Sequence, residues 1–237
     1  MSKPYPAFAR NLDYSFNSLL NQVFIWMGLG MIFTALVAYL FATNPYLYSL
    51  LSGPEGITPL GFVVMFAPLG FVLLMSIGFK RFSYLGLLGL FLVYSSIMGA
   101  SLSFIFLIYT NQSIFWVFIL TSSLFGGMGT LGYFTSIDLS KIGNLALMAL
   151  IGIIAASLVN FFLKSNTFAY LISIGCVLVF LCLIAWDLQK LKRLNEEARM
   201  GEISKSKLAV LGALTLYLDF INLFLSLLRI FGSKKGR

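Results

Sequence analysis

Long apolar runs separated by short polar segments make up most of this chain. Each run is about 19 to 25 residues long, which suits an α-helix that crosses a lipid bilayer. The pattern predicts seven such helices, at residues 23–42, 60–79, 85–108, 114–134, 145–163, 168–186 and 207–231. We therefore expect an all-α polytopic membrane protein with seven transmembrane helices.

Polar segments set the limits of the predicted domain. We expect a polar N-terminal tail at residues 1–20, one membrane domain at residues 21–232, and a basic C-terminal tail at residues 233–237. The first apolar run is too long for a signal peptide, so we expect it to be retained. Residues 188–207 are the only long charged segment and are expected to form a loop.

Small residues and one acid are expected to serve helix packing and helix ends. Glycine and serine recur in 85–108 and 114–134, where they let neighbouring helices approach closely. Gly152, Ala156 and Asn160 form a further packing seam at a spacing of four residues. Asp138 lies in a polar turn and is well placed to cap the N-terminus of the next helix.

The composition excludes a soluble globular domain. The chain is 59% hydrophobic and only 10% charged, and its net charge is +8. The Lys and Arg residues lie at helix ends and in the charged segment, so we interpret them as topology signals and contacts to lipid headgroups. We expect no nucleic-acid partner. Most of the basic residues fall on the side of the N-terminus, which favours a cytoplasmic N-terminus.

Histidine is absent and cysteine is scarce. The two cysteines, Cys176 and Cys182, lie six residues apart in one apolar run, so a helix places them on separate faces. They resemble neither a disulfide nor a metal site, and without histidine a hydrolytic metalloenzyme is disfavoured. We expect no enzymatic activity and no cofactor.

Asp219 lies near the middle of the last apolar run. It would sit roughly 15 Å from either end of a helix, where an ionised carboxylate costs at least ~2.5–3.5 kcal/mol. A helix places the small and polar residues of this run on one face: Gly212, Thr215, Asp219, Asn222, Ser226 and Arg229. This face is expected to avoid lipid, so the last helix should be enclosed by the others.

Asp187 supplies a second carboxylate, at the end of the preceding run. Consecutive spans are antiparallel and often adjacent, so Asp187 and Asp219 are expected to meet. Two adjacent carboxylates do not both ionise cheaply, so we expect the pair to share a proton and to titrate as a unit. Such a pair suits a proton-sensitive latch, a cation site or the catalytic pair of an aspartyl protease.

Four segments of the chain form a recognisable set: LTLYLDFINLFLSLLRIFG (214–232), AWDLQKLK (185–192), LGYFTSIDLSKIG (131–143) and ALIGIIAASLVNFFLKS (149–165). Together they resemble the transmembrane Bax inhibitor motif (Bax inhibitor-1-like) family in its bacterial inner-membrane branch. The resemblance implies seven helices, six of them wrapped around a central C-terminal helix. It also implies a location in the bacterial inner membrane, with several passes.

The resemblance assigns roles to three residues. Asp187 and Asp219 match the family's di-aspartyl pH sensor, and Arg81, with Lys80 as a near competitor, matches an arginine that pairs with the first aspartate. Family members are described as mediating a proton-sensitive calcium leak. Two positions depart from the family pattern: Trp186 stands where tyrosine is frequent, and Gly70 stands where the family has an acid.

The leading hypothesis is a pH-sensitive cation (Ca²⁺) leak channel gated by the aspartate pair. Ca²⁺ takes six to eight oxygen ligands, so Asp187 and Asp219 would form only a weak, transient site. Thr215, Asn222 and Ser226 would line the cation path on the last helix.

Two alternatives remain open. The first is a membrane regulator that binds or inhibits a membrane protease or another membrane complex, with residues 188–207 or the N-terminal tail as its handle. The second is an intramembrane aspartyl protease, a remote alternative because LYLD (216–219) replaces the GxGD motif of those enzymes and no PAL segment follows.

Overall fold

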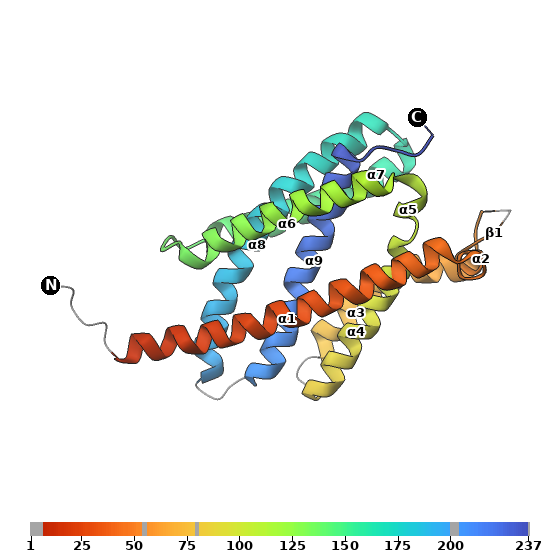
Figure 1. Cartoon of the computed structure of the whole chain (residues 1–237). Coiled ribbons are helices and arrows are strands. Elements are labelled where there is room, and N and C mark those ends of the chain that lie inside the picture. The colour runs from red at the N-terminus through yellow and green to blue at the C-terminus, as the bar shows by residue number, and fades with distance from the viewer. Residues whose placement is uncertain (1–6, 54–55, 79–80, 200–203, 237) are drawn as a thin grey trace. The chain divides into compact units, whose positions relative to one another are not determined.

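The chain is helical almost throughout the part that the structure describes. The computed structural model describes residues 7–53, 56–78, 81–199 and 204–236, without the side chains of 7–15, 69, 72–78, 197 and 199. Its helices are α1 (Ala7–Thr43), α2 (Pro45–Leu51), α3 (Pro59–Gly78), α4 (Tyr84–Leu102), α5 (Ile105–Ile108), α6 (Asn111–Phe134), α7 (Ser140–Leu163), α8 (Asn166–Arg199) and α9 (Lys205–Phe231) (Figure 1). A small hairpin of β1 (Ser52–Gly53) and β2 (Gly56–Ile57) lies between α2 and α3. The predicted all-α class is confirmed.

Six helical segments in the described residues are long and apolar enough to cross a membrane. They are Phe16–Thr43, Tyr84–Ile108, Asn111–Phe134, Ser140–Leu163, Asn166–Glu196 and Lys205–Phe231. The remaining predicted span falls on α3, whose described apolar part is Pro59–Pro68. Seven spans therefore remain a prediction.

Helices extend into the segment predicted as a loop and into the predicted polar tail. α8 continues to Arg199, so residues 188–199 are not the predicted loop. The helix continues because Leu188, Leu191 and Asn195 recur on one buried face, with exposed charged residues between them. α1 begins at Ala7, so the predicted N-terminal tail is helical over most of its length.

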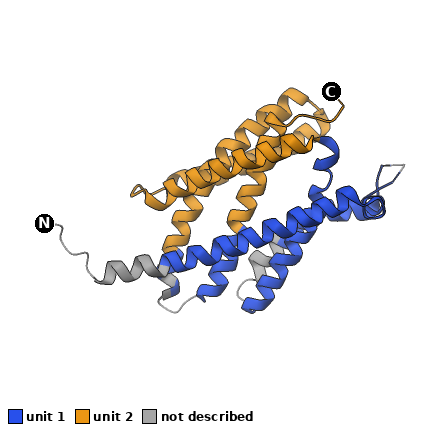
Figure 2. Ribbon diagram, in the orientation of Figure 1, with its two compact units in different colours: residues 1–108, 194–214 blue, residues 109–193, 215–237 orange. Residues whose placement is uncertain are grey.

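The chain divides into two compact units (Figure 2). Unit 1 comprises residues 1–108 and 194–214, and in it α4 packs against both α1 and α3. Gly99 of α4 lies against the backbone of Thr34 of α1, and the Thr34 hydroxyl donates a 2.9 Å hydrogen bond to the Ser95 carbonyl. The predicted close packing through small residues is confirmed at Gly99. Gly89 is exposed, and an added Cβ there would meet no atom of the described residues, so the structure shows no close packing at this position.

Unit 2 comprises residues 109–193 and 215–237. Phe118 and Phe125 of α6 pack edge-on against Phe220 of α9, with ring centroids 5.4 and 5.6 Å apart. The packing seam predicted on α7 is wrong at Gly152, which is exposed and has open space around it. Asn160 instead serves the end of α7, where its Oδ1 accepts a hydrogen bond from the Ser165 N–H.

α9 is the most buried of the six candidate spans. Of the apolar stretch of α9, 72% is buried, whereas the buried share is at most 39% in the other candidate spans and 6% in α7. This burial agrees with the expected shelter of the last helix. The wrapping of six helices around α9 remains a prediction.

Candidate functional site

The structure brings Asp187 and Asp219 together, as their positions in consecutive helices predict. Asp187 lies on α8 and is 8% exposed, and Asp219 lies on α9 and is 5% exposed. Their carboxyl groups lie within hydrogen-bonding reach of one another. Both residues belong to unit 2 and to candidate membrane spans. The sequence predicted Asp187 at the end of its span. In the structure α8 continues to Arg199, about three turns further.

The pair has few other charged neighbours in the described part of the chain. Lys190, one turn further along α8, acts electrostatically on Asp187, and Asp187 is the charged neighbour that acts on Asp219. Two ionised carboxylates only accept hydrogen bonds, and Asp219 Oδ2 is a buried acceptor that no described donor reaches. One proton on the pair would supply the missing donor and form a carboxyl–carboxylate hydrogen bond.

Three glycines position the turn of α8 that carries Asp187. Gly132 of α6 lies against the Ala185 backbone, and Gly143 of α7 lies against the Trp186 ring. An added Cβ at Gly129 would be 3.0 Å from Leu188. Because these helices meet at glycine, α8 approaches them too closely to rotate freely, and the direction of Asp187 is fixed.

Trp186 directly precedes Asp187 on α8. Its ring is buried, and the Lys190 ammonium lies 4.9 Å from the ring centroid in a cation–π contact. The indole Nε1 has no hydrogen-bond partner in the described residues. The ring therefore acts through packing and contacts Lys190, the cation that acts on Asp187 among the described residues.

The polar residues predicted to line a cation path are bonded largely to their own helix. Asn222 Nδ2 donates to the Leu218 carbonyl at 2.8 Å, and Ser226 Oγ donates to the Asn222 carbonyl at 2.7 Å. Thr215, one turn before Asp219, is half-buried. Ser226 also lies within hydrogen-bonding reach of the Cys176 thiol, whereas the Asn222 side-chain oxygen remains available as an acceptor among the described residues. The path along these residues remains a prediction.

The described residues around the pair do not make a tight calcium cage. Three or more His, Cys, Asp or Glu side chains gather nowhere in the part of the chain that the structure describes. Two carboxylates supply at most about four oxygens, fewer than the six to eight that Ca²⁺ takes. The pair therefore suits a passing cation.

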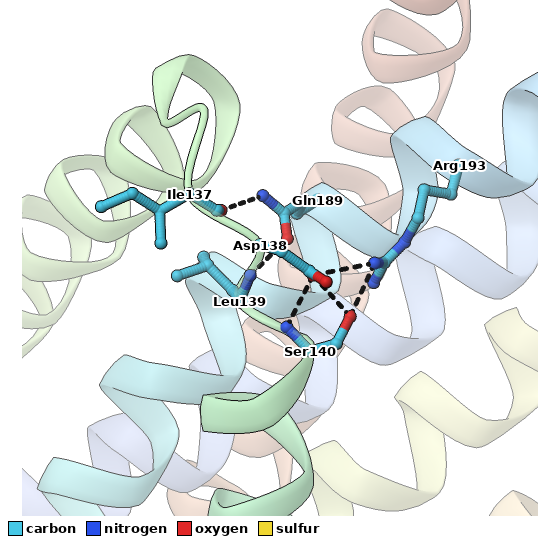
Figure 3. A network of polar contacts seen from close by, with 6 residues as sticks. All are labelled: Ile137, Asp138, Leu139, Ser140, Gln189 and Arg193. Atoms are coloured by element: carbon cyan, nitrogen blue, oxygen red, sulfur yellow. Dashed lines mark hydrogen bonds and ion pairs between the residues drawn. The ribbon is translucent and has the colours of Figure 1, made fainter.

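A second polar network joins the α6–α7 turn to α8, and sequence analysis identified only one of its members (Figure 3). Asp138 Oδ1 accepts hydrogen bonds from the Ser140 N–H at 3.0 Å and the Ser140 hydroxyl at 2.6 Å. The Arg193 guanidinium donates to the same oxygen at 3.2 Å. Asp138 does bond the first turn of α7, but the N-cap position itself is Leu139.

Gln189 completes this network from the C-terminal half of α8. Its Oε1 accepts from the Leu139 N–H and its Nε2 donates to the Ile137 carbonyl, both at 2.8 Å (Figure 3). The bonds from Ser140, followed by the Arg193 charge, hold the pKa of Asp138 below its ordinary value. Gln189 and Arg193 lie more than 50 residues along the chain from this turn, so no local pattern indicated their role.

Comparison with known proteins settles the family. The family model described as "Inhibitor of apoptosis-promoting Bax1" matches residues 16–236. The chain belongs to the Bax inhibitor-1-like family. It is 43% identical over 215 residues to the inner membrane protein YbhL of Escherichia coli, with 90% of this chain and 91% of that protein covered.

Two further relatives extend this comparison across bacteria. An uncharacterized protein of Rickettsia prowazekii is 40% identical over 226 residues, and the alignment covers 95% of this chain and 94% of that protein. An uncharacterized protein of Borreliella burgdorferi is 38% identical over 221 residues, with coverage of 93% and 94%. The YbhL name states a location, and none of the three names states an activity.

The arginine of the expected Bax inhibitor-1-like latch lies in the other unit. Arg81 is exposed, in the turn before α4, and belongs to unit 1, whereas the aspartates belong to unit 2. Lys80 lies outside the described residues. The pairing of Arg81 with Asp187 remains a prediction.

Proposed function

We propose that this membrane protein is a proton-sensitive leak for Ca²⁺, with Asp187 and Asp219 as the proton sensor. The observation that supports it most is the contact of two buried carboxyl groups inside candidate membrane spans. Buried acids inside a membrane domain are costly and mark ion or proton pathways. By analogy with the E. coli relative, the protein resides in a bacterial inner membrane.

The charge of the pair is the variable that the proton controls. With one proton, the two groups share a hydrogen bond and a single negative charge. Without it, two like charges lie in contact and favour either separation of α8 from α9 or entry of a cation. Both responses change the space between the two helices, which links protonation to conduction.

A passing Ca²⁺ would bind the aspartate pair weakly. The pair supplies carboxylate oxygens, and Thr215, Asn222 and Ser226 continue the path along α9 with side-chain oxygens. In this proposal six helices surround α9, so opening requires a shift of this buried helix. Arg81 would stabilise the closed state by pairing with Asp187, because a broken pair leaves a costly lone charge.

Ca²⁺ flux through purified protein in liposomes tests the proposal. Wild type should release Ca²⁺ faster than protein-free liposomes, at a rate that changes between about pH 6 and about pH 8. The double variant Asp187→Asn/Asp219→Asn should lose this pH response. Glu196→Gln, which neutralises an exposed acid further along α8, should keep it. Equal flux from wild type and the double variant at every pH would remove the aspartates from the mechanism.

A further inference from the structure

One end of unit 2 carries a cavity lined by polar and basic residues. Its volume is about 360 Å³, and the residues that line it include Tyr109, Asn166, Tyr170, Ser173, Arg229 and Lys234. The side chains include two tyrosine hydroxyls, a carboxamide, a guanidinium and an ammonium, all of which donate hydrogen bonds. This cavity is separate from the aspartate pair, since Arg229 follows Asp219 by ten residues on α9.

The C-terminal segment is held against this cavity by backbone contacts. The Thr110 N–H donates to the Ser233 carbonyl at 2.9 Å, and Lys234 forms a β-bridge with Tyr109. Gly232 lies against the Tyr109 ring, where a side chain would clash. These contacts fix the backbone of Lys234 beside the cavity that Arg229 also lines, so the fold places two basic residues on one cavity.

No acidic side chain of unit 2 pairs with these two charges among the described residues. The sequence has no Asp or Glu in 109–137, 139–186 or 220–237. The acidic side chains of unit 2 are therefore Asp138, which pairs with Arg193, and the two aspartates Asp187 and Asp219, which face each other. Among the described residues, neither Arg229 nor Lys234 forms an ion pair. Two cations at one cavity repel each other unless an anion from outside the chain binds there.

The cavity also lies at the ends of candidate membrane spans, where the membrane surface is expected. It is formed where the candidate spans α6 and α8 begin and where α9 ends. Basic and aromatic residues at span ends contact lipid headgroups, and the first turn of a helix such as α8 adds N–H groups that favour anions. Phosphate groups of lipid headgroups are the abundant anions at a membrane surface, so a phosphate group is the anion that suits this position.

We propose that this cavity binds a phosphate group, with Arg229 and Lys234 as its charged ligands and the Tyr109 and Tyr170 hydroxyls as further donors. The guanidinium of Arg229 has the geometry to bind two phosphate oxygens at once. The phosphate belongs either to an anionic phospholipid headgroup or to free inorganic phosphate, and the experiment below separates these sources.

The experiment measures the thermal unfolding midpoint of the full-length protein in detergent, because a ligand of the folded state raises it. Wild type is titrated separately with short-chain phosphatidylglycerol, with inorganic phosphate and with short-chain phosphatidylcholine. The same titrations use Arg229→Gln, Lys234→Gln and the control Lys141→Gln, which removes an exposed lysine outside the cavity.

Phosphatidylglycerol should raise the wild-type midpoint more than phosphatidylcholine does. Arg229→Gln and Lys234→Gln should each need an about tenfold higher phosphatidylglycerol concentration for the same rise in midpoint, as expected for loss of one charge-assisted hydrogen bond. Lys141→Gln should respond like wild type. A matching response to inorganic phosphate would support a site for the free anion as well. No response of wild type to phosphatidylglycerol or phosphate, or an equal loss in Lys141→Gln, would overturn the proposal even if a cavity variant failed to fold. Neither result bears on the aspartate pair.

Discussion

Gly132 of α6 lies so close to Ala185 of α8 that a Cβ at position 132 would overlap the Ala185 carbonyl oxygen. Ala185 precedes Asp187 by two residues. The contact therefore sets how closely α8 approaches α6 at the turn that carries the first acid of the pair.

Gly132→Ala should destabilise the protein. The new methyl group meets backbone, which yields less easily than a flexible side chain, and such overpacking typically costs about 1–3 kcal/mol. Gly126→Ala on the same helix is the matched control, since nothing lies near an added Cβ there. Thermal unfolding in detergent should show a lower midpoint for Gly132→Ala and an unchanged or higher midpoint for Gly126→Ala. Equal midpoints for the two variants would argue against this contact.

Gln189→Ala should loosen the turn between α6 and α7. It removes a donor to Ile137 and an acceptor for the Leu139 N–H, each worth about 1 kcal/mol. Gln189→Glu retains the acceptor and loses the donor. Hydrogen exchange at the Leu139 amide should therefore be faster in Gln189→Ala and close to wild type in Gln189→Glu. Unchanged protection in Gln189→Ala would show that the amide is bonded elsewhere.

Asp138 should make a small contribution to stability that disappears in acid. Its pKa is lowered from 3.8 by the Ser140 hydrogen bonds and then by Arg193, so folding favours the ionised carboxylate. The contribution is complete above the unfolded value and is lost as the pH falls through the lower folded value. The difference in melting temperature between wild type and Asp138→Asn should be positive at neutral pH and vanish well below 3.8. A difference that persists in strong acid would contradict this assignment.

The predicted topology has seven spans and a cytoplasmic N-terminus. It puts the start of α9 on the cytoplasmic side and its end on the outer side of the membrane. In a chain whose native cysteines are replaced, Ser233→Cys should react with an impermeant thiol reagent applied from outside. Ser204→Cys should react only after the membrane is opened. Both positions are exposed. Labelling of both from the same side would mean that α9 does not cross, or that the number of spans before it is wrong.

The two acids were predictable because the signal is local. A carboxylate in an apolar run of membrane length carries a cost that the fold must meet, whatever surrounds it, so Asp219 stands out from the sequence alone. Asp187 was predicted at a helix end, and the structure places it within α8. Leu191 and Asn195 continue the buried face of that helix into the charged segment. The high charge of that segment had led to the prediction of a loop.

The contacts that position the acids were not predictable in detail. Sequence shows that α6 and α7 contain small residues but does not show which of them face a partner. Gly132 and Gly143 meet α8, whereas Gly126 and Gly152 meet open space. Likewise, the bonding of Asp138 to Ser140 is local, but its partner Arg193 lies 55 residues away. Pairings across such distances depend on the fold.

The pH response of Ca²⁺ flux in the single variants Asp187→Asn and Asp219→Asn, compared with the double variant, tests the aspartate pair most directly. If the two acids share one proton, removing either one abolishes the response as completely as removing both, because the losses do not add. Partial losses in the single variants that sum to the loss in the double variant would mean that the aspartates titrate independently, and would contradict the account.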